Sequence, residues 1–126
     1  MNNSGNLILY KASAGSGKTY TLAKAYLKIL IHNPYDYNKI LAVTFTKKAT
    51  AEMKSRIIEY LSRLEKHDVK LNSLRNDIIH EIKTEKNIDV QADFDKHVRI
   101  ALQLILHDYS NFNISTIDSF FQGIIR

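Results

Sequence analysis

The sequence contains no cysteine among its 126 residues. Disulfides and thiolate-ligated zinc or iron–sulfur clusters are therefore excluded, and the composition fits a reducing, cytoplasmic environment. The first ten residues have no lysine or arginine and only the short apolar run LILY, so we expect no signal peptide. No stretch approaches the ~18 apolar residues that a membrane-spanning helix needs, and we expect no membrane partner.

Glycine and proline are scarce as well, with four glycines and one proline. No glycine lies between Gly17 and Gly123, and the single proline, Pro34, follows Asn33 at the expected end of a helix. Apolar spacing predicts strands at 7–10, 40–45 and 112–116, and helices at 18–31, 48–66 and 117–126. Two further helices, beginning near Leu71 and Phe94, would form a helical insertion over 67–110.

This alternation of strands and helices predicts an α/β fold with about three parallel strands, because two strands joined through a helix form a parallel crossover. We interpret residues 1–126 as part of a P-loop (RecA-like) three-layer domain, with flanking helices and the 67–110 insertion. At this length we expect no second complete domain.

The net charge of +5 is unevenly distributed. Residues 11–66 hold eleven Lys/Arg and four Asp/Glu, a net of +7, whereas residues 67–126 hold seven Lys/Arg and nine Asp/Glu, a net of −2. A basic half can be an electrostatic footprint for a polyanion, or simply solvated surface. Both interpretations stay open from sequence alone.

Residues 12–19, ASAGSGKT, match the phosphate-loop pattern G-x-x-x-x-G-K-[ST], with Ala12 in place of the first glycine. In such a loop the backbone N–H groups and the following helix N-terminus form an anion site. We therefore predict that the loop holds ATP, that Lys18 reaches the β- and γ-phosphates, and that the Thr19 hydroxyl binds Mg²⁺. The nucleotide-binding residues are predicted to be Ala12, Ser13, Ala14, Gly15, Ser16, Gly17, Lys18 and Thr19, with Lys18 and Thr19 taking part in catalysis.

Two further blocks, ILAVTFTKKATAEMKSRI at 40–57 and ISTIDSFFQGIIR at 114–126, accompany the phosphate loop. Together the three blocks resemble superfamily 1A DNA helicases of the UvrD, Rep, RecB and AddA type. The resemblance implies ATP-driven translocation on single-stranded DNA and duplex unwinding in DNA repair or recombination. It also implies that the second and third blocks contact DNA. The DNA-binding candidates are Thr44, Phe45, Thr46, Lys47, Thr116, Ser119 and Phe120.

Physical reasoning supports those candidates, because open α/β sheets place ligands at the carboxyl ends of their strands. Hydroxyl groups can hold phosphates, and an aromatic ring can stack on any base. A competing interpretation makes Phe45 a buried strand residue and at least one of Phe120 and Phe121 a core residue. Thr116 is also a suitable N-cap for the last helix.

The sequence departs from the family in two respects and lacks part of the machinery. Lys47 stands where UvrD and Rep have asparagine, and no adenine-reading glutamine motif precedes the loop, which favours the RecB/AddA branch. Hydrolysis in the family needs an acidic pair on a later strand and arginines from a second motor domain. Asp108 and Asp118 are weak candidates for the acid. We expect an N-terminal piece of a longer helicase, inactive alone and partnered by the rest of that chain. A nuclease or another protein of the same assembly is a further candidate partner.

Two other hypotheses remain at this stage. A small P-loop kinase would need an acceptor pocket and an arginine-rich lid, and the 67–110 segment offers only Arg75 and Arg99. A non-catalytic nucleotide- or DNA-binding module would share the loop without the chemistry.

Overall fold

The computed structural model describes residues 6–9 and 16–125, and the side chains of residues 20–122. The chain forms an α/β fold, as the alternating pattern predicts. The strands are β1 (Asn6–Leu9), β2 (Ile40–Thr44) and β3 (Ile114–Thr116). The helices are α1 (Ser16–His32), α2 (Lys47–Glu65), α3 (Asn72–Lys86), α4 (Phe94–His107) and α5 (Ile117–Ile125). Three short 3₁₀ helices, η1 (Pro34–Lys39), η2 (Val69–Leu71) and η3 (Tyr109–Asn111), were not predicted.

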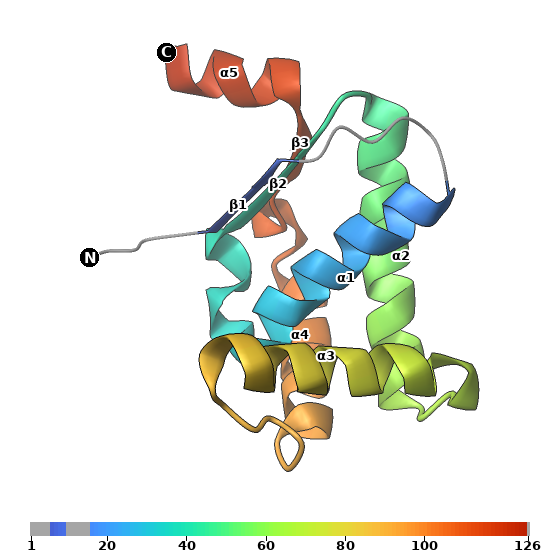
Figure 1. The fold of residues 1–126 in the computed structure, drawn as a ribbon. Coiled ribbons are helices and arrows are strands. Elements are labelled where there is room, and N and C mark those ends of the chain that lie inside the picture. Colours follow the sequence, from blue (N-terminus) through green and yellow to red (C-terminus); the bar gives the residue numbers. More distant parts are fainter. Residues whose placement is uncertain (1–5, 10–15, 126) are drawn as a thin grey trace.

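The three strands form one parallel sheet in the order β1-β2-β3, which confirms the predicted parallel pairing. The register pairs Leu9 with Val43 and Thr44 with Thr116, so the strands end at nearly the same level. Figure 1 shows α1 to α4 grouped on one side of this sheet, while α5 extends away from them beyond β3.

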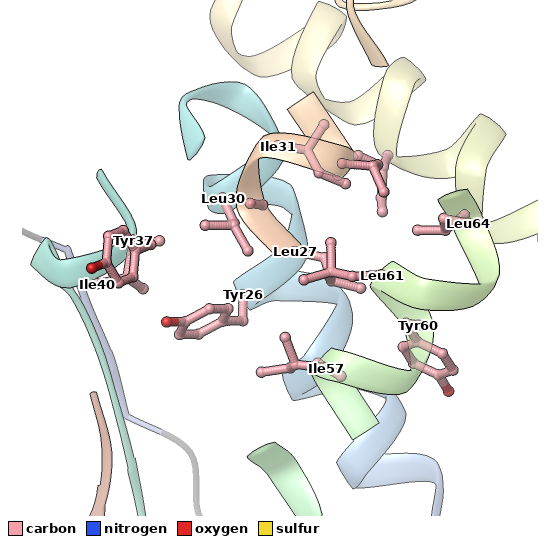
Figure 2. Close-up of a cluster of buried hydrophobic side chains, with 14 of the residues drawn as sticks. Tyr26, Leu27, Leu30, Ile31, Tyr37, Ile40, Ile57, Tyr60, Leu61 and Leu64 are labelled. Atoms are coloured by element: carbon pink, nitrogen blue, oxygen red, sulfur yellow. The ribbon is translucent and has the colours of Figure 1, made fainter. Parts of the chain in front are cut away.

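Side chains of α1 and α2 form the centre of the core, where the apolar faces of the two helices meet (Figure 2). Leu27, Leu30 and Ile31 of α1 are fully buried, as are Ile57 and Leu61 of α2. Their spacing is the one that predicted both helices, because residues three and four apart share one face. The ring of Tyr26 packs edge-on against Phe112, with ring centroids 5.7 Å apart.

The helical segment 67–110 belongs to this same core. Its buried side chains join the α1–α2 cluster instead of forming a second one, and α4 packs against both α1 and α2. Phe94, Val98, Ala101 and Ile105 of α4 are fully buried. The segment is therefore an integral part of the fold. Together with α2 it forms the long connection from β2 to β3.

Candidate nucleotide and nucleic-acid site

The carboxyl ends of the strands bring the predicted motifs together. Thr44 ends β2 and Thr116 ends β3, and the two residues are paired in the sheet. Helices α2 and α5 begin within three residues of the ends of β2 and β3, and α1 is the next helix in the sequence after β1. Helix N-termini present unpaired N–H groups and partial positive charge, so this edge suits negatively charged ligands.

In the sequence, the predicted phosphate loop falls between β1 and α1. Ala12, Ser13, Ala14 and Gly15 lie outside the described residues. Ser16, Gly17, Lys18 and Thr19 form the first turn of α1, whose helix begins two residues earlier than the sequence predicted, and their side chains also lie outside the described part. The flanking elements are a strand and a helix in the order that the motif requires. The nucleotide-binding residues themselves stay a prediction.

Thr44 is the only polar residue among the described side chains that is fully buried, with 1% of its surface exposed. Its Oγ1 lies 2.6 Å from Thr50 Oγ1, 3.2 Å from the carbonyl oxygen of Thr46 and 3.4 Å from that of Ser115. The side chain is thus enclosed between β2, β3 and the first turn of α2. Its hydroxyl is therefore turned away from solvent and toward the neighbouring backbone.

The Phe45 ring lies between Thr44 and Thr46, two residues whose side chains form hydrogen bonds. Thr46 is the N-cap of α2, and its Oγ1 accepts a hydrogen bond from the Ala49 N–H at 3.0 Å. Phe45, between Thr44 and Thr46, is 51% exposed. The interpretation of Phe45 as a buried strand residue is therefore wrong, because β2 ends at Thr44 and the chain turns into α2.

The third block forms a similar turn at the end of β3. Thr116 Oγ1 accepts a hydrogen bond from the Ser119 N–H at 3.2 Å, as expected of an N-cap, and donates to Ser119 Oγ at 3.0 Å. Phe120 is partly buried and Phe121 is 53% exposed, and their rings pack edge-on at 5.5 Å. Neither belongs to the buried core, contrary to the expectation that at least one would.

The charges at the starts of α1 and α2 are of one sign, whereas α5 carries Asp118 in its first turn. The first turns of α1 and α2 contain no acidic residue, and α2 begins with the exposed pair Lys47 and Lys48. Cations at a helix N-terminus oppose the helix dipole, so this placement costs stability in the absence of an anion. In the described part of the chain no salt bridge compensates either lysine.

Other parts of the basic half are neutralised inside the fold. Lys24 Nζ lies 2.6 Å from Glu81 and Lys28 Nζ lies 2.8 Å from Glu85, so α1 is paired with the acidic face of α3. The bond from Lys24 lowers the pKa of Glu81, and a second bond from Lys28 Nζ to Glu81 at 3.3 Å acts in the same direction. The polyanion footprint inferred from net charge is therefore too broad, and Lys47 and Lys48 are among the described lysines that no salt bridge compensates.

Asp108, one of the candidates for a hydrolytic acid, lies before β3 instead of at its end. Its carboxylate accepts hydrogen bonds from the Tyr37 hydroxyl and from the Asn111 side chain. The bond from Tyr37 lowers the pKa of Asp108 and raises that of Tyr37 to about 12. The pair joins η1 to η3 at the amino ends of β2 and β3, so Asp108 does not take part in the site. Asp118 lies in the first turn of α5, exposed at the strand-end edge.

An aromatic cluster that the sequence did not reveal lies beside the first turns of α1. Tyr20 packs edge-on against Tyr60 of α2, with ring centroids 6.2 Å apart. Arg56 lies over the Tyr60 ring at 5.8 Å and donates to Tyr60 Oη at 3.4 Å. Tyr60 shares a face of α2 with the buried Ile57 and Leu61. Only the packing of α1 on α2 shows its contact with Tyr20.

Comparison with known proteins fits this arrangement. A family model described as UvrD/REP helicase N-terminal domain matches residues 1–126. The chain belongs to this family. An ATP-dependent helicase/nuclease subunit from Pediococcus pentosaceus is 35% identical over 126 residues, which is 100% of this chain and 8% of that protein. RecBCD enzyme subunit RecB of Borreliella burgdorferi is 34% identical over 109 residues, covering 86% of this chain and 8% of the relative.

A third relative, an ATP-dependent helicase/nuclease subunit from Clostridium botulinum, is 36% identical over 121 residues, with 94% of this chain and 8% of that protein covered. The UvrD/REP family membership and these AddA- and RecB-type relatives confirm the superfamily 1A resemblance. The chain spans about 8% of the length of these curated relatives. No solved structure matches it. Across the described residues, no helix is both long and apolar enough to cross a membrane.

Proposed function

We propose that this chain is the ATP- and DNA-binding part of an ATP-dependent DNA helicase of the AddA/RecB kind. The relatives are named as ATP-dependent helicase/nuclease subunits and as a RecBCD subunit, which supports a helicase, ATP use and assembly with partner subunits or a nuclease. In this proposal the α/β fold is part of a P-loop three-layer domain, completed by the rest of the helicase chain.

The observation that carries the proposal is the convergence at the carboxyl ends of β1, β2 and β3. The N-termini of α2 and α5, the uncompensated Lys47 and Lys48 and the exposed Phe45 ring occupy one edge of one sheet. We assign the phosphate loop, Ala12 to Thr19, to Mg-ATP, with Lys18 on the β- and γ-phosphates and the Thr19 hydroxyl on Mg²⁺. Backbone N–H groups of the loop would surround the phosphates without a side chain in the way.

The strand-end turns are assigned to single-stranded DNA. Lys47 supplies charge to the phosphates, Phe45 stacks on a base, and Thr46, Thr116, Ser119 and Phe120 line the same edge. We no longer assign the Thr44 side chain to DNA contact, because it is buried. In the proposal it supports the backbone of the strand-end turn instead. ATP binding and hydrolysis between this domain and a second motor domain would then advance the strand, with the hydrolytic acids supplied outside residues 1–126.

One observation weakens the kinase alternative. Arg75 lies over the Phe94 ring at 4.5 Å and forms a salt bridge with Asp95, so it joins α3 to α4. An arginine held in this way is not available as a lid residue on a phosphate acceptor. Of the two arginines in 67–110, only Arg99, exposed on α4, remains.

The DNA assignment is tested by titrating labelled oligo-dT with the chain at several salt concentrations. We expect Phe45→Ala to weaken binding by about 1–3 kcal/mol, the usual loss of one base stack. Tyr35→Ala is the matched control, because Tyr35 is 65% exposed in η1, before β2 and away from the strand ends. Equal losses for both variants, or no binding even at low salt, would refute the assignment, since phosphate contacts strengthen steeply as salt falls.

A further inference from the structure

Thr50 lies near the start of α2. It contacts residues of the edge where β2 and β3 end, which we call the DNA-contact edge because the proposed DNA-binding residues lie there. It is half-buried, and its Oγ1 lies 2.6 Å from the buried Thr44 Oγ1 and 3.2 Å from the carbonyl oxygen of Thr46. The Thr50 N–H also donates to that carbonyl at 3.0 Å. One residue of α2 therefore contacts the residues on both sides of Phe45.

The hydroxyl contacts extend from α2 to β3. At 2.6 Å, one hydroxyl hydrogen must lie between Thr44 and Thr50. Either hydroxyl can donate it. When Thr44 donates, the hydrogen of Thr50 is left for the carbonyl oxygen of Thr46 at 3.2 Å, so that Thr50 joins Thr44 to Thr46. When Thr50 donates, the hydrogen of Thr44 is left for a carbonyl oxygen, either that of Thr46 at 3.2 Å or that of Ser115 at 3.4 Å. Ser115 immediately precedes Thr116, so the two proposed DNA-contact turns share this small cluster of hydroxyl and carbonyl groups.

The exposure of Phe45 makes this cluster important for binding. Phe45 is half-exposed in a turn. If the backbone of this turn were not already fixed, DNA binding would have to order it at a cost in conformational entropy, and the affinity would fall. Thr44 and Thr46 flank the ring, and Thr50 contacts both. The geometry points to an indirect contribution of Thr50 to DNA binding.

We propose that Thr50 is a positioning residue of the DNA-contact edge: its hydroxyl fixes the backbone around Phe45 through Thr44 and Thr46, so that the ring is pre-arranged to stack on a base. This inference rests on the proposed DNA binding and adds a residue to that site. Thr50 touches neither nucleotide nor DNA.

The test is a titration of labelled oligo-dT with the 126-residue chain and its variants. Thr50→Val removes the hydroxyl and keeps the shape, whereas Thr50→Ser keeps the hydroxyl. Thr84→Val is the matched control. Thr84 is exposed on α3, so this substitution makes the same chemical change away from the strand ends. Phe45→Ala and the double variant Phe45→Ala/Thr50→Val complete a cycle that measures whether Thr50 acts through the ring.

We expect Thr50→Val to bind about two- to tenfold more weakly, the range for one lost hydrogen bond. Thr50→Ser and Thr84→Val should bind like the unaltered chain. The salt dependence should be unchanged in Thr50→Val, because no phosphate contact is lost. In the Phe45→Ala background the Thr50 substitution should have no further effect. If Thr50→Val does not fold, Thr50→Ala provides the same comparison with a good helix former.

Two results would overturn the inference while leaving the proposed function standing. One is full-strength binding by Thr50→Val, and the other is a loss that adds to that of Phe45→Ala. Failure of the unaltered chain to bind oligo-dT at low salt would instead refute the proposed DNA binding and this inference together.

Discussion

Replacing Phe94 by alanine should remove a large part of the stability of the whole chain. Phe94 is fully buried in α4, and the Arg75 guanidinium lies 4.5 Å from its ring centroid. Truncating a buried phenylalanine typically costs about 3–5 kcal/mol, and the lost cation–π contact adds about 0.5–1 kcal/mol. A domain has about 5–15 kcal/mol in total, so one residue of the 67–110 segment would account for a substantial fraction.

Urea denaturation followed by far-ultraviolet circular dichroism measures this effect. With an m value of about 2 kcal/mol/M, a loss of ~4 kcal/mol lowers the midpoint by about 2 M. Phe121→Ala is the matched control, since Phe121 is 53% exposed and should change stability by less than about 0.5 kcal/mol. A single transition is also expected, because the buried residues form one cluster. Equal midpoints for Phe94→Ala and the unaltered chain would show that the segment is a separate appendage.

Two smaller effects follow from the helix contacts. Thr46→Ala should lower the free energy of unfolding by about 1 kcal/mol, because α2 loses its N-cap bond to Ala49, and urea unfolding beside the exposed Thr84→Ala checks this. Glu81→Gln should cost at most about 1 kcal/mol at pH 7, because its partly exposed bonds to Lys24 and Lys28 are screened by solvent. Since the folded pKa of Glu81 is lowered, its contribution is present above the unfolded pKa and is lost as the pH falls through the folded pKa. The unaltered chain and Glu81→Gln should therefore converge in acid, and a constant difference from pH 7 to pH 2 would contradict this explanation.

Sequence patterns were sufficient for the order of the elements. The apolar spacing of α1, α2 and α4 reflects one buried face each, so it predicted these helices within a few residues. The three 3₁₀ helices were missed, because three to six residues are too few to show a period.

The contacts that shape the site were less predictable. Lys24 and Lys28 pair with acidic residues more than 50 positions away, so a count of charges overestimated the free basic surface. The burial of Thr44 and the exposure of Phe45 depend on where β2 ends. A shift of the strand by one residue would reverse which of the two side chains faces the interior. Thr50 lies inside the matched block, but only the packing of α2 against β2 and β3 reveals its role.

In the proposed function, nucleotide binds through the loop before α1. Mg-ATP binding, measured by calorimetry on the unaltered chain, Lys18→Ala and Lys96→Ala, tests it most directly. Lys96 is exposed on α4, so its substitution removes one positive charge on α4, outside the proposed loop. We predict that Lys96→Ala binds like the unaltered chain and that Lys18→Ala binds at least about tenfold more weakly, because a charge-assisted bond to phosphate is lost. Equal affinity of Lys18→Ala and the unaltered chain would contradict the assignment of residues 12–19 to the phosphates.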